Sequence, residues 1–283
     1  MIKTIENENL KVQISDMGAE LQSIFNKNNN CEYLWYGDEK IWSGRSPVLF
    51  PIVGEVLDET YTYSGKEYHL NRHGFAKFSK FDVVKETPTC VTFSLKSSEK
   101  TLKVYPFEFE LLVTFSIENN RITVKHEVIN TNDGEMYFSL GAHPGFNCEI
   151  GDSLVFSEKE TLNTERVNEK GVRIDETFPV LNNSSEIIIT ENIFDTDALI
   201  FKGFKSKSIT LKSPNHSREV RFNLGDAPYL GIWAKPGAPY VCIEPWHGVC
   251  DTCHGNEDFS KKQFIEHLNK GENFEFTWFA DII

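Results

Sequence analysis

Residues 107–117 read FEFELLVTFSI, and this stretch decides the fold that the sequence predicts. Every odd position in it is apolar, while most of the even positions carry Glu, Thr or Ser. A period of two residues is typical of a strand that buries one face. Asn119 and Asn120 follow, and asparagine tolerates the left-handed backbone of a turn. Alternation then resumes over residues 122–128, so the segment predicts a long antiparallel hairpin.

The same alternation recurs in other parts of the chain. It is found at residues 220–224 and again at 274–278, close to the end. Short apolar runs at 186–190 and 198–201 are typical of strands covered on both faces. Aromatic residues make up 13% of the sequence, and aromatic side chains favour strands. The sequence therefore predicts an all-β protein.

One segment favours a helix, namely Ser260–Leu268, where Ser260 and Gln263 could form a capping box. No stretch reads as a linker, and residues 26–30 (NKNNN) are typical of a polar hairpin tip. A β-sandwich of 200–250 residues commonly folds as one domain. We therefore expect residues 1–283 to form a single large antiparallel β-sandwich.

Composition excludes several classes of function. Lys and Arg total 29 and Asp and Glu total 42, which gives a net charge of −13. A nucleic-acid binder or a protein that binds anionic membranes needs a basic surface, so we expect neither partner. No signal peptide or run of about 20 apolar residues is visible, and we expect a cytoplasmic protein. The six cysteines are then expected to be free thiols.

Four residues at breaks in the alternation are candidates for chemistry. Glu244 ends an apolar run before a Trp, and burial of that kind raises the pKa of a carboxyl group into the range of acid–base catalysis. The alternative for Glu244 is a structural ion pair. Arg45 has apolar neighbours, so its guanidinium is expected to be paired or to bind a ligand oxygen. His73 and His143 adjoin Gly or Pro, where a histidine is either an ordinary surface residue or projects into a concave face.

Two other features are interpreted as structural. The sequence from Cys250 to His254 reads CDTCH, which matches c-type haem attachment and half of a zinc site. A zinc site needs about four ligands, and no second Cys-x-x-Cys exists, so we interpret the match as a coincidence in a loop. His126 lies in register with the apolar residues of its strand, and we expect it to be a core residue.

Taken together, four segments resemble the aldose 1-epimerase (galactose mutarotase) family, and within it the LacX-like branch. They are RSPVLFP at 45–51, HGFA at 73–76, GAHPGFN at 141–147 and EPW at 244–246. Their order and spacing extend over the chain from about residue 14 to its end. The loop from Cys250 to Asn256 carries Cys and His residues that the family pattern does not ask for. The resemblance implies the galactose mutarotase-like β-sandwich, in agreement with the alternation.

The resemblance also implies an activity, the interconversion of the α and β anomers of a hexose. This reaction opens a cyclic hemiacetal, so one group must take the proton of the C1 hydroxyl while another donates a proton to the ring oxygen. Glu244 matches the family's base and His143 its acid. Arg45 and His73 match positions that hold the ring oxygen and the oxygen at C1.

Further roles follow from the same resemblance. Asp197 matches the carboxylate that binds a sugar hydroxyl, although Asp195 next to it is an alternative. Phe146 and Trp233 are expected to pack on the C–H face of the sugar. The family needs no metal or cofactor. We expect a monomer or homodimer whose partner is a small sugar.

Three alternatives remain open at this point. The substrate could be a hexose 6-phosphate, for which Arg72, Lys77 and Lys80 could form a cluster of cations. The chain could be a non-catalytic carbohydrate-binding or regulatory protein, which would have no need for an acid–base pair. It could also be a glycosidase that uses Asp197 and Glu244 as paired carboxylates, which would leave His143 without a catalytic role.

Overall fold

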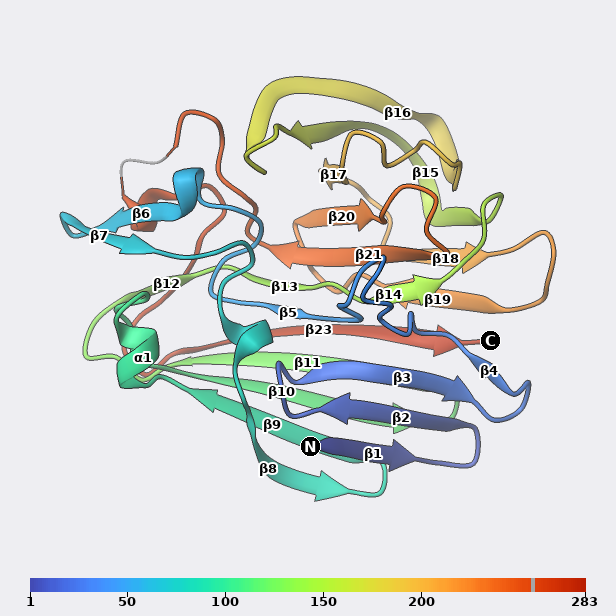
Figure 1. The fold of residues 1–283 in the computed structure, drawn as a ribbon, viewed down its shortest axis with the longest axis horizontal. Coiled ribbons are helices and arrows are strands. Elements are labelled where there is room, and N and C mark those ends of the chain that lie inside the picture. Colours follow the sequence, from blue (N-terminus) through green and yellow to red (C-terminus); the bar gives the residue numbers. More distant parts are fainter. Residues whose placement is uncertain (256–257) are drawn as a thin grey trace.

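The computed structural model describes residues 1–255 and 258–283 and is built mostly from β-strands (Figure 1). A four-stranded sheet contains β1 (Ile2–Glu6), β2 (Leu10–Ser15), β3 (Glu20–Asn26) and β4 (Cys31–Glu32), in that order. Two small two-stranded sheets pair β6 (Thr60–Tyr63) with β7 (Lys66–His69), and β12 (Met136–Phe138) with β22 (Glu266–Leu268). In the described residues, the helical segments are α1 (Glu99–Leu102) and the short 3-10 turns η1 (Leu57–Glu59), η2 (Ala76–Phe78) and η3 (Phe259–Lys261).

The other strands form one large sheet. In spatial order it contains β5 (Val48–Leu49), β13 (Leu140–Ala142), β21 (Tyr240–His247), β20 (Tyr229–Trp233), β17 (Leu199–Lys202), β15 (Ser153–Val167), β18 (Ser208–Lys212), β19 (Glu219–Asn223), β23 (Asn273–Ile282), β11 (Arg121–Asn130), β10 (Phe109–Glu118), β9 (Cys90–Lys96) and β8 (Asp82–Thr87). Two strands lie off this path: β14 (Gly145–Asn147) pairs with β21, and β16 (Arg173–Ile188) pairs with β15.

The predicted hairpin is confirmed as β10 and β11. The two strands pair antiparallel from Phe109 opposite Asn130 to Glu118 opposite Arg121. Asn119 has a φ of 52°, the left-handed conformation expected at this turn. Buried and partly buried residues alternate along both strands, because the apolar face covers the core and the polar face lies toward solvent.

The core of the molecule lies between the layers. One cluster of buried apolar residues includes Leu21 and Ile24 of β3, Val113 of β10, Val124 of β11 and Trp278 of β23. In Figure 1, β1, β2 and β3 lie in front of the lower part of the large sheet, and β1 also contacts β9 and β10. The all-β antiparallel sandwich predicted from the alternation is therefore confirmed.

Two predictions about single segments have different outcomes. His126 is buried in the core, 1% exposed, and its ring stacks on Phe276, as expected. The predicted helix over Ser260–Leu268 is wrong: a 3-10 turn ends at Lys261, and residues 266–268 form β22. Phe264 has a φ of 57°, which an α-helix excludes. The buried ion pair between Lys262 and Asp251 holds this segment against a neighbouring loop, and such tertiary contacts override a short helical pattern.

The six cysteines are free thiols, as expected. Asn256, the last residue of the unusual loop noted in the sequence, lies outside the described residues. Within the described ranges, no helix has the length and apolar character needed to cross a membrane.

The pairing around β21 positions the candidate site. β13 pairs with the C-terminal end of β21, where Gly141 lies opposite Trp246. β14 pairs with the N-terminal end of β21, where Gly145 lies opposite Cys242. The chain thus leaves β21 after residue 142 and rejoins it at residue 145. The amide of Ile243 donates a hydrogen bond to the carbonyl of Pro144 across this gap. The short loop is therefore held directly beside the middle of β21.

Candidate active site

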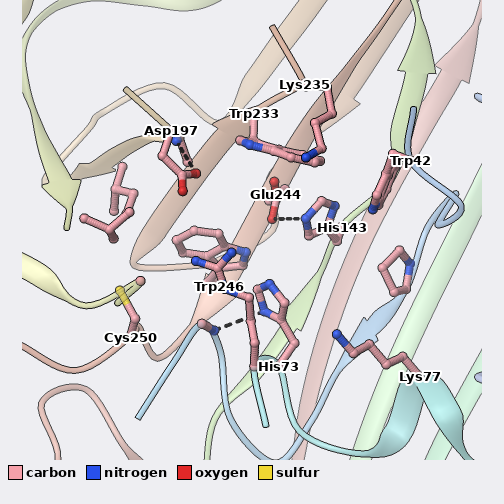
Figure 2. Close-up of a pocket in the computed structure, with 17 residues that line it drawn as sticks. Trp42, His73, Lys77, His143, Asp197, Trp233, Lys235, Glu244, Trp246 and Cys250 are labelled. Atoms are coloured by element: carbon pink, nitrogen blue, oxygen red, sulfur yellow. Dashed lines mark hydrogen bonds and ion pairs between the residues drawn. The ribbon is translucent and has the colours of Figure 1, made fainter. Parts of the chain in front are cut away.

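A cavity of about 300 Å³ opens beside β20 and β21, and most of the sequence-predicted residues line it (Figure 2). That volume is within the range of small-molecule sites. The lining includes Glu244 of β21, Trp233 of β20, His143 from the loop between β13 and β14, His73, and Asp197. These residues are spread over 172 positions of sequence, from 73 to 244, and the sheet brings them together.

Glu244 and His143 face each other at the base of the cavity. Nε2 of His143 lies 3.2 Å from Oε2 of Glu244 (Figure 2). The side chains are almost buried, since Glu244 is 1% and His143 7% exposed. The contact lacks the alignment of a hydrogen bond, and among the described residues neither Oε2 of Glu244 nor Nδ1 of His143 has a hydrogen-bond partner. These two atoms therefore have unused hydrogen-bonding capacity in the described part of the chain.

Burial shifts the pKa values of these two groups in opposite directions. It raises the pKa of the Glu244 carboxyl group well above its ordinary value, although the Trp246 indole and Arg72 oppose this change. It lowers the pKa of the His143 imidazole to about 3. Desolvation always disfavours the charged form, so both shifts favour a carboxylic acid and a neutral imidazole. The pair then holds one proton over a wide range of pH.

His73 is held as a hydrogen-bond donor. The backbone N–H of Gly54 donates to Nδ1 of His73 at 3.0 Å. Because Nδ1 accepts, the proton of the neutral ring must be on Nε2. Burial lowers the pKa of His73 well below its ordinary value, and His143 adds to this effect, its ring centroid lying 5.7 Å away. His73 therefore offers one N–H group of defined direction to the cavity.

Asp197 lies across the cavity from His143, with Glu244 between them (Figure 2). It has a φ of 69°, and its Oδ1 accepts a hydrogen bond from the amide of Ala198 at 2.7 Å. The Arg166 guanidinium donates to the Asp197 carbonyl. These bonds fix the orientation of the carboxylate. Asp195, the alternative considered in the sequence, is not among the residues that line the cavity.

Aromatic side chains form the wall next to His143. Trp233 packs edge to face against His143, with ring centroids 5.7 Å apart. Trp42, which the sequence analysis did not select, packs against both rings and stacks on Tyr240. Trp246 also lines the cavity, and Gly231 makes room for it, since a Cβ atom there would lie 2.3 Å from its ring. The only sequence signal for Trp42 is its position three residues before Arg45.

Cations also line the cavity. Arg72 forms an ion pair with Glu55 at 3.2 Å. Lys77 lines the same side of the cavity and Lys235 lies beyond Trp233 (Figure 2). Within the described part of the chain, neither lysine ammonium has a carboxylate partner. Burial and the charge of Arg72 lower the pKa of Lys77. Lys235 was missed in the sequence, although it follows Trp233 by only two positions.

Three residues proposed from the sequence lie away from the cavity lining. The Arg45 guanidinium donates to the carbonyl of Gln22, so it is paired with backbone. Phe146 is fully buried and packs against Phe222 in the core. Lys80 is exposed and lies 3.9 Å from Asp16. Arg45 still supports the site indirectly, because its backbone carbonyl accepts a hydrogen bond from the amide of Gly145, just after the loop that carries His143.

Comparison with known proteins identifies the family. The model of the aldose 1-epimerase family matches residues 1–277. A plasmid-encoded LacX protein of Lactococcus lactis subsp. lactis is 31% identical over 261 residues, which cover 87% of each chain. A galactose mutarotase related enzyme from Lactobacillus acidophilus is 34% identical with a TM-score of 0.95, over 100% of this chain and 97% of that one. A galactose mutarotase-like protein from Lactobacillus casei is 29% identical with a TM-score of 0.94, over the full length of both. Since the family model spans nearly the whole sequence and the LacX protein matches over 87% of each chain, this chain belongs to the aldose 1-epimerase family.

Proposed function

We propose that the protein is a mutarotase that interconverts the α and β anomers of a hexose. The observation that carries the proposal is the buried pair of Glu244 and His143, 3.2 Å apart at the base of a sugar-sized cavity. Family membership supports an isomerase of this kind. A protein that only binds sugar has no need for two buried titratable groups at the centre of its site, so the pair favours catalysis.

Ring opening needs one proton removed and one donated. In the proposed reaction, the one proton of the pair lies on His143 in the reactive form, so Glu244 as carboxylate takes the proton of the C1 hydroxyl while His143 as imidazolium gives a proton to the ring oxygen. The C1–O5 bond breaks and C1 becomes an aldehyde. The C1–C2 bond then rotates, and the two transfers reverse at the other face of the carbonyl. Protons and electrons balance, and both residues return to their starting forms.

The burial of the pair acts on this sequence in a definite direction. Opening the ring converts an ion pair into a carboxylic acid and a neutral imidazole. The cavity favours these uncharged forms, as the pKa directions of both groups indicate. The open-chain intermediate therefore leaves the pair in the same uncharged form that burial favours in the free protein.

The other lining residues hold the sugar. Nε2–H of His73 donates to a sugar oxygen near C1, and the Asp197 carboxylate accepts from hydroxyl groups at the opposite end. Trp233 and Trp42 provide flat apolar surface for the C–H face of the ring. This assignment replaces Phe146 with Trp42 as the second aromatic residue at the sugar.

A phosphorylated hexose is a second candidate substrate. Lys77 and Lys235 line the cavity, and no carboxylate of the described residues pairs with either of them, in a protein of net charge −13. Unpaired ammonium groups at a cavity are suited to a phosphate, which they bind as point charges. Replacing Lys77 with Met should raise KM for glucose 6-phosphate about 10- to 100-fold, the value of one or two charge-assisted hydrogen bonds, and leave KM for glucose unchanged. Lys80→Met, outside the cavity, is the matched control.

Polarimetry tests the proposed function itself. Freshly dissolved α-glucose, α-galactose and glucose 6-phosphate relax to a fixed equilibrium rotation, with and without protein. We expect faster relaxation to the same final rotation with at least one of the three sugars. A protein that binds these sugars and leaves every relaxation rate unchanged would show that the site only binds.

A further inference from the structure

Cys242 lies close to the acid–base pair, and the proposed reaction assigns it no role. It lies two positions before Glu244 on β21, so the two side chains are on the same face of the strand. Gly145 pairs with Cys242 across the sheet, and a Cβ atom at Gly145 would lie 3.4 Å from Sγ. The thiol is fully buried and lies behind the cavity wall.

Three metal-binding atoms of different chemistry converge at this point. One ligand atom each from His143, Cys242 and Glu244 lies within 4.8 Å of the other two. Imidazole, thiolate and carboxylate are the three ligand types that zinc accepts in proteins. Bonds of 2.0–2.3 Å to a tetrahedral ion place two ligand atoms roughly 3.3–3.7 Å apart. The 3.2 Å between Nε2 of His143 and Oε2 of Glu244 is about 0.1 Å below this spacing, and the sulfur, within 4.8 Å of both, has to approach by about 1 Å.

An unpaired buried oxygen also favours an ion at this position. Oε2 of Glu244, the atom that lies 3.2 Å from Nε2 of His143, is buried without a hydrogen-bond partner in the described residues, although buried polar atoms are nearly always paired.

We propose that His143, Cys242 and Glu244 form a site for a thiophilic divalent cation such as Zn²⁺, and that its occupation switches the enzyme off. The cavity provides the entry path, since His143 and Glu244 line it. A water or a sugar hydroxyl completes the tetrahedron, as in other open zinc sites. The bound ion ties up the base and the acid together, so neither can exchange a proton with sugar. The inhibitory part of this inference rests on the proposed function, while the metal site does not.

Cadmium titration tests the site without any activity. Cd²⁺ bound to a thiolate absorbs in the ultraviolet, so the absorbance reports the sulfur ligand directly. We expect the wild type to bind one tight equivalent and Cys242→Ala to bind at least about 100-fold more weakly, more than the 10- to 100-fold that an outer-shell partner contributes. Cys242→Ser, which keeps the size of the side chain, should behave like Cys242→Ala if both melt like the wild type.

A second cluster provides the matched control. Asp175, Cys253 and His254 also bring ligand atoms together, but all three are exposed. Cys253→Ser should retain the tight equivalent. If Cys253→Ser loses the absorbance and Cys242→Ala keeps it, or if the wild type shows no thiolate band, the inferred site is wrong.

Mutarotation then tests the consequence of binding. Zn²⁺ should inhibit the wild type in step with site occupancy and leave Cys242→Ala, assayed at the same zinc concentrations, active. Binding that depends on Cys242 without inhibition would contradict the claim that the ion occupies the acid–base pair. If the protein has no mutarotase activity, the proposed function fails, and the cadmium titration still decides whether the metal site exists.

Discussion

The pH dependence of anomer exchange follows directly from the burial of His143. The pKa of this imidazole is lowered to about 3, so the pair with Glu244 accepts a second proton only in strong acid. At pH 5, about 1% of the molecules would carry that second proton, against about 97% for a histidine with the ordinary pKa of 6.5. The Glu244 carboxyl group, whose pKa is raised, loses the single proton of the pair as pH rises. The rate should therefore be at least as high at pH 5 as at pH 7.

Exchange spectroscopy between the two anomers measures this rate at equilibrium, without a change in sugar concentration. Circular dichroism at each pH has to show the same folded protein. A fall of about 25-fold between pH 7 and pH 5 is what an ordinary histidine would produce, and it would refute this account of the pair. If the rate falls as pH rises, the cause is that Glu244 loses the proton of the pair. A fall of this kind is usually assigned to the loss of a proton from histidine.

Further predictions concern stability and binding. Burial lowers the pKa of His126 to about 3, so the contribution of its neutral ring to the free energy of unfolding is complete above pH 6.5 and is lost as pH falls toward 3. In urea unfolding, the wild type should therefore lose about 2 kcal/mol more stability than His126→Leu between pH 7 and pH 5, and equal losses would contradict this. Asp197→Asn keeps the hydrogen bond to the Ala198 amide but loses the charge of the carboxylate. A charged hydrogen-bond acceptor contributes roughly 1 kcal/mol more than a neutral one, so KM should rise about five-fold with kcat nearly unchanged. An unchanged KM would show that Asp197 does not bind the sugar. Replacing both Cys250 and Cys253 with Ser should leave turnover within a few-fold of the wild type, because Cys253 is exposed and Cys250 contributes only a small thiol to the cavity wall. A metal bound to the wild type and lost from the double variant together with activity would contradict this.

The sheets were predictable because their signal is local. In β10 and β11, the position of a residue in the two-residue period decides which face of the sheet its side chain is on. A turn of two asparagines joins the two strands. The segment after Ser260 was mispredicted because its conformation depends on distant partners. Lys262 pairs with Asp251, and Gln263 accepts a hydrogen bond from Arg173, so the chain is held away from a helix by residues that no local pattern contains.

The site was predictable only where chemistry and family resemblance coincided. Glu244 and His143 stand at breaks in strand patterns and match the family's motifs, yet their 3.2 Å approach depends on two strands pairing with the two ends of β21. Trp42 and Lys235 lie in ordinary loop sequence, so only the folded structure places them at the cavity. Arg45 was predicted to hold a sugar oxygen, but its guanidinium donates to the carbonyl of Gln22, and Arg45 is not among the residues that line the cavity.

The most direct test of the central claim is a paired measurement on Glu244→Gln. Gln keeps the shape of the side chain and its hydrogen bonding to hydroxyl groups, but it cannot accept a proton at neutral pH. We predict that the variant binds sugar, by calorimetry, with an affinity close to that of the wild type, while anomer exchange falls by at least about 10²- to 10⁴-fold, the usual contribution of general acid–base catalysis. His143→Asn should lose a similar factor, and the double variant should lose little more than either single one, since each group works only with the other. Near-wild-type exchange in Glu244→Gln would contradict the account.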